Sequence, residues 1–512
     1  MDRLIPFFVI LPLISAFLIP VFGRLIKGFS KVMALLVFAL LLLLSLYYLF
    51  RGEHASFIYK IGGWEPVNGV PIAIYFILDP LSGFMLIIIN MMAFLSTLYS
   101  VSYITRYTGE NYFYTLLTIM VAGLNGIVIT GDLFNLYVFL EITVIASYAL
   151  VAFGTEKEEL EASFKYQVLG GMATALILFS IGMIYWYTKT LNIFDISAIL
   201  KSSHDLKLIE FTQLVLIAGF GLKAAIMPFH GWLPDAHSSA PSPISAMLSG
   251  VVIKAAGLYV IFRLFFNMFE ISHVIGILIT TIGTLSMVVG VFLAIGQWDL
   301  KRLLAYHSIS QMGYVILGVG MGMMILSENG SMTIAALAIT GGLFHLINHA
   351  VFKGLLFLNA GSIEYRLGTR DLKRMGGLFS SMPFTSTTSL GASMAISGIP
   401  PFNGFFSKLI IIVAAIQAKF YLLAFLAVLV SIITLASFLK FQRFAFFNTN
   451  VERGNNKTKE VPFTMVLSMA ILAILCLGLS LLVIPGVRDT LLQPAVNILT
   501  GKNDYFIHLI NM

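Results

Sequence analysis

Long apolar runs, separated by short polar connections, repeat along the whole chain. About 20 apolar residues are the length that crosses a bilayer as an α-helix. The runs predict about 14 transmembrane helices, and therefore an all-α polytopic membrane protein. Their approximate spans are 4–23, 32–50, 74–100, 112–130, 133–153, 163–187, 211–230, 244–267, 274–296, 303–325, 332–360, 382–416, 420–441 and 462–484.

Two of the predicted helices, the seventh and the twelfth, are interrupted by proline and glycine. Prolines crowd the chain just after Lys223, and the run GIPPFNG comes just before Lys408. Proline breaks the helical hydrogen-bond ladder, and irregular backbone survives at membrane depth only where protein or a water-filled cavity surrounds it. Paired interruptions in the two halves of a transporter are typical of an ion site.

The position of the two breaks predicts an internal repeat. Each broken helix is the fourth in a set of five, which indicates two inverted five-helix repeats. The predicted organisation is therefore 1–105 with helices 1–3, 112–268 with helices 4–8, 274–442 with helices 9–13, and 460–512 with helix 14 and a tail.

Composition narrows the classes of function. Hydrophobic residues make up 59% of the chain and charged residues 11%, whereas soluble domains carry about 25% charged residues. The single cysteine, Cys476, excludes an internal disulfide and a cysteine-ligated cluster. We find no nucleophile elbow and no HExxH motif, and we expect no catalytic residue, cofactor or metal. Whether the chain belongs to an enzyme complex is left open by its own residues.

Positive charge is distributed unevenly between alternate loops. The richer set includes 24–31, 366–374 and 443–459. The positive-inside rule places these loops in the cytoplasm, and an even helix number then places both termini outside the cell membrane. The net charge of +7 needs no nucleic acid to explain it, because clustered phosphate-directed patches are missing.

Five charged residues lie inside stretches that otherwise read as lipid-embedded helix. They are Glu141, Lys223, Lys254, Lys353 and Lys408. Each charge costs about 2.5–3.5 kcal/mol at a helix centre, so a row of them indicates a proton or cation pathway. Glu141 has no basic neighbour in its own helix, and Lys223 is its natural partner. For Lys254 and Lys408, the alternative is a side chain that snorkels to the interface.

Histidines add a second clue. His345, His349 and Lys353 recur at i, i+4 and i+8, which places them on nearly one helix face. Histidine titrates near neutral pH, so this ladder can relay protons; the alternative is a polar face that binds neighbouring helices. Three further histidines occupy candidate water-access positions: His230, His237 and His307.

Five linked motifs carry a resemblance to a known family. They are GDLFNLYVFLEITVIASYAL (131–150), GLKAAIMPFHGWLPDAHSSAPSPISAMLSGVVIKAAGLY (221–259), DLKRLLAYHSISQMGYVILG (299–318), FHLINHAVFKGLLFLNAG (344–361) and GIPPFNGFFSK (398–408). They resemble the proton-translocating antiporter-like family. It includes the A and D subunits of Mrp-type Na+/H+ antiporters, the L, M and N subunits of respiratory complex I, and the related subunit of membrane-bound hydrogenases.

The resemblance implies roles for the buried charges. The family's essential fifth-helix glutamate matches Glu141, and its partner on the broken seventh helix matches Lys223. Lys254 matches the lysine that relays toward the centre, and Lys408 matches the twelfth-helix position. The eleventh-helix histidine and lysine positions match His345, His349 and Lys353. No cofactor is implied for this subunit.

The resemblance also implies H+ or Na+ translocation within a multi-subunit energy-transducing complex. It favours a membrane-bound hydrogenase or sulfur-reductase type, with other membrane subunits and redox subunits carrying Ni-Fe and iron–sulfur centres. The length fits a D-like or N/M-like subunit, so a free-standing Mrp antiporter and complex I remain alternatives. A purely structural membrane subunit and an organic-solute carrier are alternatives of a different class.

Overall fold

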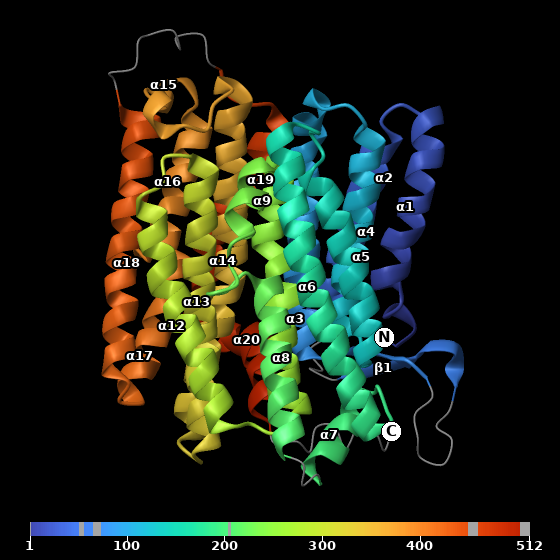
Figure 1. Ribbon diagram of the computed structural model, residues 1–512. Coiled ribbons are helices and arrows are strands. Elements are labelled where there is room, and N and C mark those ends of the chain that lie inside the picture. Colours follow the sequence, from blue (N-terminus) through green and yellow to red (C-terminus); the bar gives the residue numbers. More distant parts are fainter. Residues whose placement is uncertain (1, 51–55, 65–72, 203–205, 449–458, 502–512) are drawn as a thin grey trace.

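The protein is a bundle of mostly upright helices (Figure 1). The computed structural model describes residues 2–50, 56–64, 73–202, 206–448 and 459–501. Much of the third basic loop, 449–458, therefore lies outside the described residues. Within those ranges, 12 helices are long and apolar enough to cross a membrane.

The helices follow one another in an up-and-down order along the chain. The first half contains α1 (Phe7–Leu25), α2 (Phe29–Phe50), α3 (Pro80–Tyr103), α4 (Glu110–Ile129), α5 (Leu133–Val151), α6 (Lys157–Thr188), α7 (Ile193–Lys201), α8 (Leu206–Ala224), α9 (Leu233–Ser239), α10 (Ser242–Met247) and α11 (Val260–Arg263). The second half contains α12 (His273–Ile295), α13 (Leu300–Ser327), α14 (Met332–Leu367), α15 (Leu378–Ser381), α16 (Pro383–Ser397), α17 (Asn403–Gln417), α18 (Tyr421–Gln442), α19 (Phe463–Gly478) and α20 (Pro485–Thr500).

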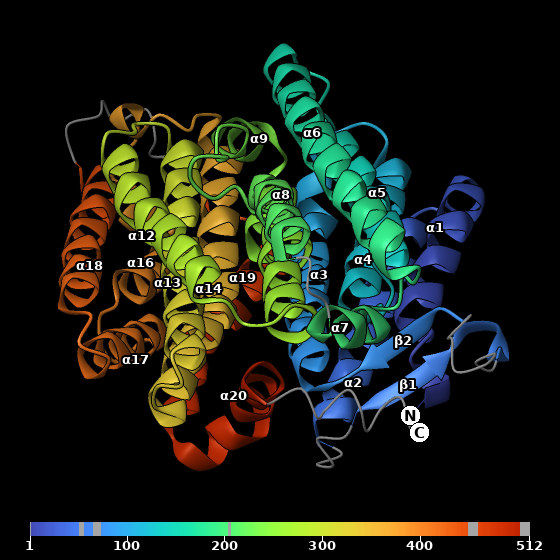
Figure 2. The ribbon, with the colours of Figure 1, turned by 60° about the horizontal axis from the view of Figure 1, so that its bottom comes forward.

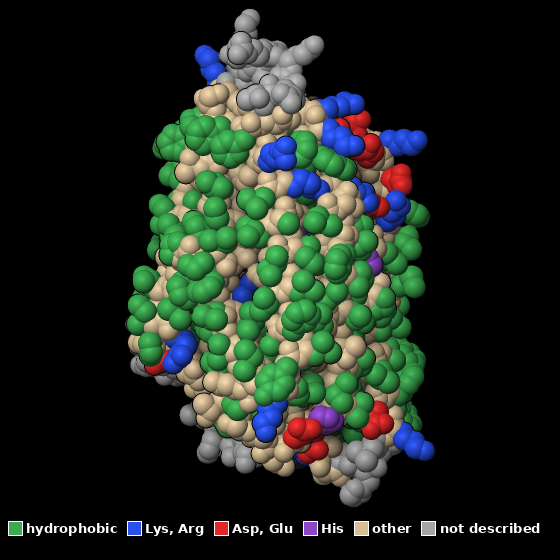
Figure 3. Space-filling model, turned by 90° about the vertical axis from the view of Figure 1, so that its left-hand side faces the viewer, with side chains coloured by type: hydrophobic (Ala, Val, Ile, Leu, Met, Phe, Trp, Pro, Cys, Tyr) green, Lys and Arg blue, Asp and Glu red, His purple; other side chains and the backbone are tan. Residues whose placement is uncertain are grey.

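Burial separates central helices from peripheral ones. The apolar window of the segment Ser242–Met268 is wholly buried inside the chain, and those of α3, α13 and α14 are more than four-fifths buried. The windows of α2 and α19 are 28% buried. On the face shown in Figure 3, apolar side chains cover most of the middle, while most charged side chains lie toward the two ends. This is the surface of a protein solvated by lipid around its waist.

Both predicted interruptions are present in the chain. Helix α8 ends at Ala224, and helical structure resumes with α9 at Leu233. Helix α16 ends at Ser397, and α17 begins at Asn403. In Figure 1, α8 lies below α9, whereas α16 lies above α17. Each break leaves backbone groups free of the helical ladder near the middle of the bundle, which is where the intramembrane lysines lie.

The prediction of an all-α fold overlooked a small sheet. Strands β1 (Phe57–Lys60) and β2 (Tyr75–Leu78) pair antiparallel, with Phe57 opposite Leu78 and Lys60 opposite Tyr75. The hairpin crosses one end of the bundle beneath α1 and α2 (Figure 2). Strands of four residues are too short to show a clear apolar alternation, so the sequence pattern did not reveal them.

Candidate functional site

Lys254 lies on a widened helix at the centre of the bundle. The chain from α10 to Met268 contains three π-helical segments, Leu248–Val252, Lys254–Tyr259 and Leu264–Met268. π-helical turns are rare in proteins, and those that occur often lie at functional sites. The fully buried Lys254 Nζ donates to the carbonyl oxygens of Ser249 at 2.5 Å and Gly250 at 2.8 Å. Lys254 is therefore anchored within its own helix and does not snorkel to an interface.

The break in α8 approaches this widened helix directly. A Cβ added to Gly257 would lie 2.6 Å from the Cβ of Ala224 and 2.7 Å from its Cα. Such a contact is closer than two side chains can tolerate. Glycine at 257 therefore brings the last turn of α8, which carries Lys223, against the helix that carries Lys254.

His349 and Lys353 face the same central region from α14. Lys353 is fully buried, and its Nζ donates to the carbonyl oxygen of Leu304 at 2.5 Å. Neither ring nitrogen of His349 has a hydrogen-bond partner. Four groups lie close enough to act electrostatically on this ring: Lys254, Lys353, His345 and His237. The predicted ladder of His345, His349 and Lys353 therefore forms one cluster of titratable groups with Lys254.

His345 connects this cluster to the second broken helix. Its Nδ1 is 3.0 Å from Ser407 Oγ on α17, and its Nε2 is 3.2 Å from Gln311 Oε1 on α13. The neighbouring Lys408 is 2% exposed, and its Nζ donates to Ile396 O at 2.7 Å. This ammonium also lies 4.8 Å from the centre of the Tyr314 ring, within the range of a cation–π contact.

Glu141 and Lys223 do not form the direct ion pair that the sequence predicted. Lys223 Nζ donates to Gly170 O and to Thr174 Oγ1, both at 2.9 Å, because α8 packs against α6. Glu141 Oε1 has no hydrogen-bond partner. Glu141 still lies within electrostatic range of Lys223. The structure therefore holds the two side chains apart, with Lys223 bound to α6.

The three histidines predicted at water-access positions differ in their burial. His230, between α8 and α9, is half-buried. His237 and His307 are fully buried within the chain, so any water that reaches them would be internal water. Helix α13 begins at Leu300, so His307 lies two turns inside it, where its Nε2 is 2.8 Å from Ser437 Oγ.

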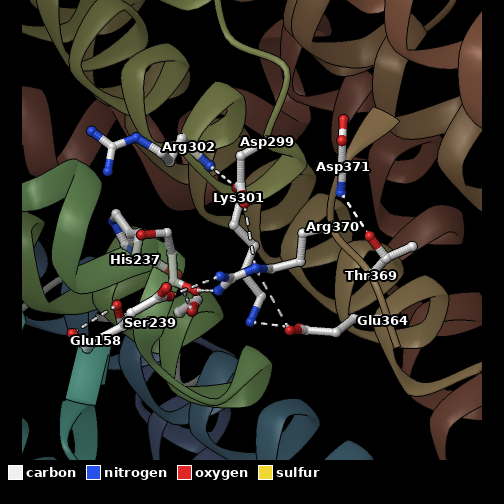
Figure 4. A network of polar contacts seen from close by, with 12 residues as sticks. Glu158, His237, Ser239, Asp299, Lys301, Arg302, Glu364, Thr369, Arg370 and Asp371 are labelled. Carbon is white, nitrogen blue, oxygen red and sulfur yellow. Dashed lines mark hydrogen bonds and ion pairs between the residues drawn. The ribbon is translucent and has the colours of Figure 1, made fainter. Parts of the chain in front are cut away.

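A charged cavity opens above His237 at the end of the bundle that carries α15. We call it the vestibule. Its volume is about 400 Å³. It is lined by Glu158, Glu161, Ala162, Lys165, Asp235, Ser238, Ser239, Asp299, Arg302 and Arg370. Figure 4 shows the network of polar contacts around it, with His237 beside Ser239. No group of three His, Cys, Asp or Glu side chains in the described ranges is arranged to hold a metal ion.

Asp235 is the most strongly held acid of the vestibule. Its two carboxylate oxygens lie 2.6 Å from Arg302 Nη1 and 3.0 Å from Lys165 Nζ. Burial opposes its ionisation, but the hydrogen bonds and charges of Lys165 and Arg302 together outweigh burial and lower the pKa of Asp235. This acid therefore carries a negative charge at neutral pH.

Lys301 shares an ion-pair partner, Glu364, with Arg370, which lines the vestibule. It is 2% exposed, lies 2.8 Å from Glu364 Oε2, and donates to Ala240 O between α9 and α10 at 3.1 Å. Its charge acts on His237, as do those of Lys353 and Lys254. Lys301 thus stands between the solvent-facing ion pairs and the central cluster. The sequence did not single out Lys301, because it lies at the start of a predicted helix, where lysine is common.

A second buried charge pair lies at the opposite end of the bundle. Asp79, wholly buried at the N-terminus of α3, accepts from Arg263 Nη1 at 2.7 Å and from Nη2 at 2.8 Å. The same guanidinium lies beside the hydroxyl of Tyr259, which donates to Val128 O. These bonds tie the end of the widened helix to α3 and α4, and so help to hold Lys254 in position.

Comparison with known proteins decides the family. Residues 130–434 match the model of the NADH:quinone oxidoreductase/Mrp antiporter transmembrane family, and residues 64–114 match that of the N-terminus of chain 5 of NADH-ubiquinone oxidoreductase (complex I). The chain belongs to this antiporter-like membrane family. The matched region contains all seven predicted ion-translocation residues.

Relatives from several kinds of complex resemble this antiporter-like chain. It is 32% identical to the N subunit of the NADH-quinone oxidoreductase of Desulforudis audaxviator, over 90% of each chain. It is 31% identical to the D subunit of the Na(+)/H(+) antiporter of Alkalihalophilus pseudofirmus, over 91% of this chain and 93% of that one. A chain of the membrane-bound sulfane sulfur reductase, an archaeal respiratory membrane complex, superposes over 99% of both chains with a TM-score of 0.86 and 27% identity.

Proposed function

We propose that this chain moves H+ or Na+ across the cell membrane as an antiporter-like subunit of a multi-subunit energy-transducing complex. One observation carries the proposal. Lys254, Lys353 and Lys408 are buried, and among the described residues none of them forms an ion pair with a carboxylate. Their Nζ atoms donate mainly to carbonyl oxygens.

Unpaired buried lysines are suited to proton exchange. A lysine locked in an ion pair must break that pair when it loses its proton, and doing so is costly in a dry interior. A lysine bound to neutral acceptors keeps the same neighbours in either charge state. Since charges in the interior interact over several ångströms, a proton on one lysine shifts the proton affinity of the next. The file from Lys254 to Lys408 can therefore pass a charge by electrostatic coupling.

Glu141 and Lys223 supply the control element of this scheme. When the two side chains approach each other, the Glu141 carboxylate offsets the positive charge of Lys223, and the central cluster experiences a weaker field. When they separate, the full charge of Lys223 acts on the cluster again. The structure holds them apart, with Lys223 bound by Gly170 and Thr174. We assign the vestibule and His237 to proton entry at one end, and Lys408 to exchange with the opposite aqueous side.

The proposed organisation follows from the two breaks. Adding the broken helices α8–α9 and α16–α17 to the 12 long spans makes 14 crossings, grouped as two inverted five-helix repeats. The basic loops 24–31 and 366–374 would face the cytoplasm, with both termini outside. Partner subunits then cover part of the apolar waist.

For the complex itself, we propose a membrane-bound hydrogenase or sulfur-reductase type. The likeness to the sulfane sulfur reductase chain supports it, and the likeness to the D subunit of the Na(+)/H(+) antiporter supports a free-standing Mrp antiporter as the second candidate. Purification of the intact complex separates the two. Redox subunits with Ni-Fe and iron–sulfur centres are expected for the first, and small membrane subunits alone for the second.

Substitution of the control pair tests the transport function. Glu141→Ala and Lys223→Ala are each expected to abolish transport in sealed vesicles while the complex still assembles. In either variant the remaining group has lost the partner whose approach and separation change the charge that acts on Lys254. Assembly is checked by co-purification of the other subunits. Full transport in either variant would contradict the scheme and favour a purely structural role, in which neutralising buried charges is harmless.

A further inference from the structure

The first half of the second broken helix carries an unusual number of buried hydroxyl groups. Helix α16 has the sequence PFTSTTSLGASMAIS. Its buried hydroxyl residues, together with Asn359 on α14 and Gln442 on α18, are here called the hydroxyl file. They are Thr385, Ser386, Thr388, Ser389, Ser393 and Ser397. Small hydroxyl residues are common where membrane helices pack together, so what distinguishes this helix is the set of side chains that its hydroxyl groups bind.

The file begins at the same end of the bundle as the vestibule. Glu460 caps the N-terminus of α16, where its Oε2 accepts from the backbone N–H of Phe384 at 2.9 Å and of Thr385 at 3.2 Å. Its Oε1 accepts from the Thr385 hydroxyl at 2.6 Å. Glu460 is only partly buried, so the carboxylate joins the first hydroxyl of the file to the aqueous surface.

Two amide side chains continue the file toward the middle of the bundle. The Thr388 hydroxyl donates to Asn359 Oδ1 at 2.9 Å. Gln442 Nε2 donates to Ser389 Oγ, on the residue after Thr388, at 3.0 Å, and to Ser393 Oγ, one turn deeper, at 2.8 Å. The two amides reach α16 from two different helices, α14 and α18.

The file ends at Lys408. Ser431 on α18 donates to Ser397 O at 2.8 Å, and Lys408 Nζ donates to Ser431 Oγ at 3.3 Å. The same ammonium donates to Ile396 O, at the last turn of α16. The Nζ of Lys408 therefore faces the lower end of α16, although Lys408 itself belongs to α17.

Unfilled hydrogen-bonding capacity recurs at three levels of this file. Asn359 Nδ2, Gln442 Oε1 and Ser397 Oγ are buried and have no partner among the residues that the structure describes, and their residues are 0%, 4% and 4% exposed. A buried amide left half-satisfied costs about 1–3 kcal/mol, and ordered water is the usual partner of such groups. The three atoms lie beside hydroxyls that could bond the same waters.

We propose that the hydroxyl file holds a chain of water molecules that connects the Glu460 end of the bundle to Lys408. The proposal rests on the transport function, and it gives Lys408 a supply of protons separate from the Lys254 cluster. A proton would arrive on water and transfer to the neutral Nζ. One N–H bond forms, one O–H bond of the hydronium breaks, and a neutral water remains. Lys408 then receives protons along α16 and releases them on the far side of α17.

Thiol accessibility in the intact complex tests the file directly. The native Cys476 is first replaced by Cys476→Ala, and Ser393→Cys is introduced into that background. A charged, membrane-impermeant methanethiosulfonate is then added to one side of sealed vesicles at a time. We expect Ser393→Cys to react from the Glu460 side. Leu390→Cys, on the same helix at a position 36% exposed on the outer surface, is the matched control and is expected to stay unreactive.

The outcomes separate this proposal from the transport function. No reaction at Ser393→Cys, with Ser389→Cys as a second position one turn nearer the surface, would overturn the water chain, as would reaction from the opposite side alone. Adding Gln442→Leu is expected to slow labelling at Ser393→Cys and to lower the transport rate roughly ten-fold, the effect of losing one buried hydrogen-bonded group. Labelling needs no transport, so transport-competent Glu141→Ala or Lys223→Ala would overturn the proposed function and leave the file standing.

Discussion

At the scale of single residues, this chain buries charges in two different ways. Asp79 and Arg263 neutralise each other through two short hydrogen bonds. Within the described part of the chain, Lys254 and Lys353 have no such partner and bind carbonyl oxygens instead. Burial is complete for Asp79, Lys254 and Lys353, so the difference lies in the partners. Removal of one partner from a buried pair leaves the other charge uncompensated, whereas the proposed transport needs lysines without a fixed counter-charge.

Asp79→Asn tests the structural half of this contrast. Asparagine keeps the N-terminal cap of α3 but leaves the Arg263 guanidinium buried without its counter-charge. Breaking a buried pair costs about 3–5 kcal/mol, so thermal unfolding of the purified complex should begin at a clearly lower temperature. Asp489→Asn, which removes the partner of Arg488 in an exposed pair, is the control and should cost about 0–1 kcal/mol. Equal effects of the two variants would contradict the assignment.

Asp235 gives a prediction about pH. Its pKa lies below the usual 3.8, since the hydrogen bonds from Lys165 and Arg302 outweigh its burial. Its contribution to stability is therefore fully present above 3.8 and is lost as the pH falls through the lower folded pKa. Asp235→Asn should reduce stability equally at pH values from about 6 to 8. If thermal unfolding instead shows that the stability lost in Asp235→Asn changes with pH within that window, a group other than Asp235 titrates there and determines the stability of the vestibule.

Sequence reasoning found some buried charges and missed others for a physical reason. Lys254 and Lys353 stand deep inside apolar runs, where the cost of a charge makes them conspicuous. Arg263 and Lys301 lie near predicted helix ends, where charges are ordinary. Arg263 also meets Asp79 from 184 positions away along the chain, a contact that one sequence cannot reveal.

At the scale of elements, the breaks in the two helices are the features that position the lysines. Proline and glycine mark both breaks in the sequence, so both could be predicted. The π-helical turns around Lys254 could not, because no local composition distinguishes them from α-helix. Small residues also fix how closely the half-helices approach. A Cβ on Gly404 would lie 1.9 Å from Ala395 O, so α17 can meet the last turns of α16 only through glycine at 404.

Gly404→Ala tests this close approach. The added methyl group must push α17 away from α16, and overpacking of this kind costs about 1–3 kcal/mol. We expect lower thermal stability and slower transport, because Lys408 moves relative to Ile396. Gly171→Ala on α6 is the control, since nothing lies within 4 Å of its added Cβ. Normal transport and stability in Gly404→Ala would mean that the half-helices are not held in register at this contact.

At the scale of the whole molecule, burial places the proposed pathway at the centre of the bundle. The segment Ser242–Met268 and helices α13 and α14 are enclosed by the chain itself, whereas α1, α2, α18 and α19 present much of their surface outward. The vestibule lies at one end of the bundle, and the Asp79–Arg263 pair lies at the other. Enclosure by the chain shields the buried lysines from lipid.

In the proposed transport, charge passes through the unpaired lysines of this core. Proton and Na+ movement into sealed vesicles that contain the intact complex tests this pathway, with Lys254→Met compared with Lys201→Met. Lys201 is exposed at the end of α7, outside the core. We expect Lys254→Met to abolish transport in an assembled complex and Lys201→Met to transport normally. Undiminished transport by Lys254→Met would rule out this pathway.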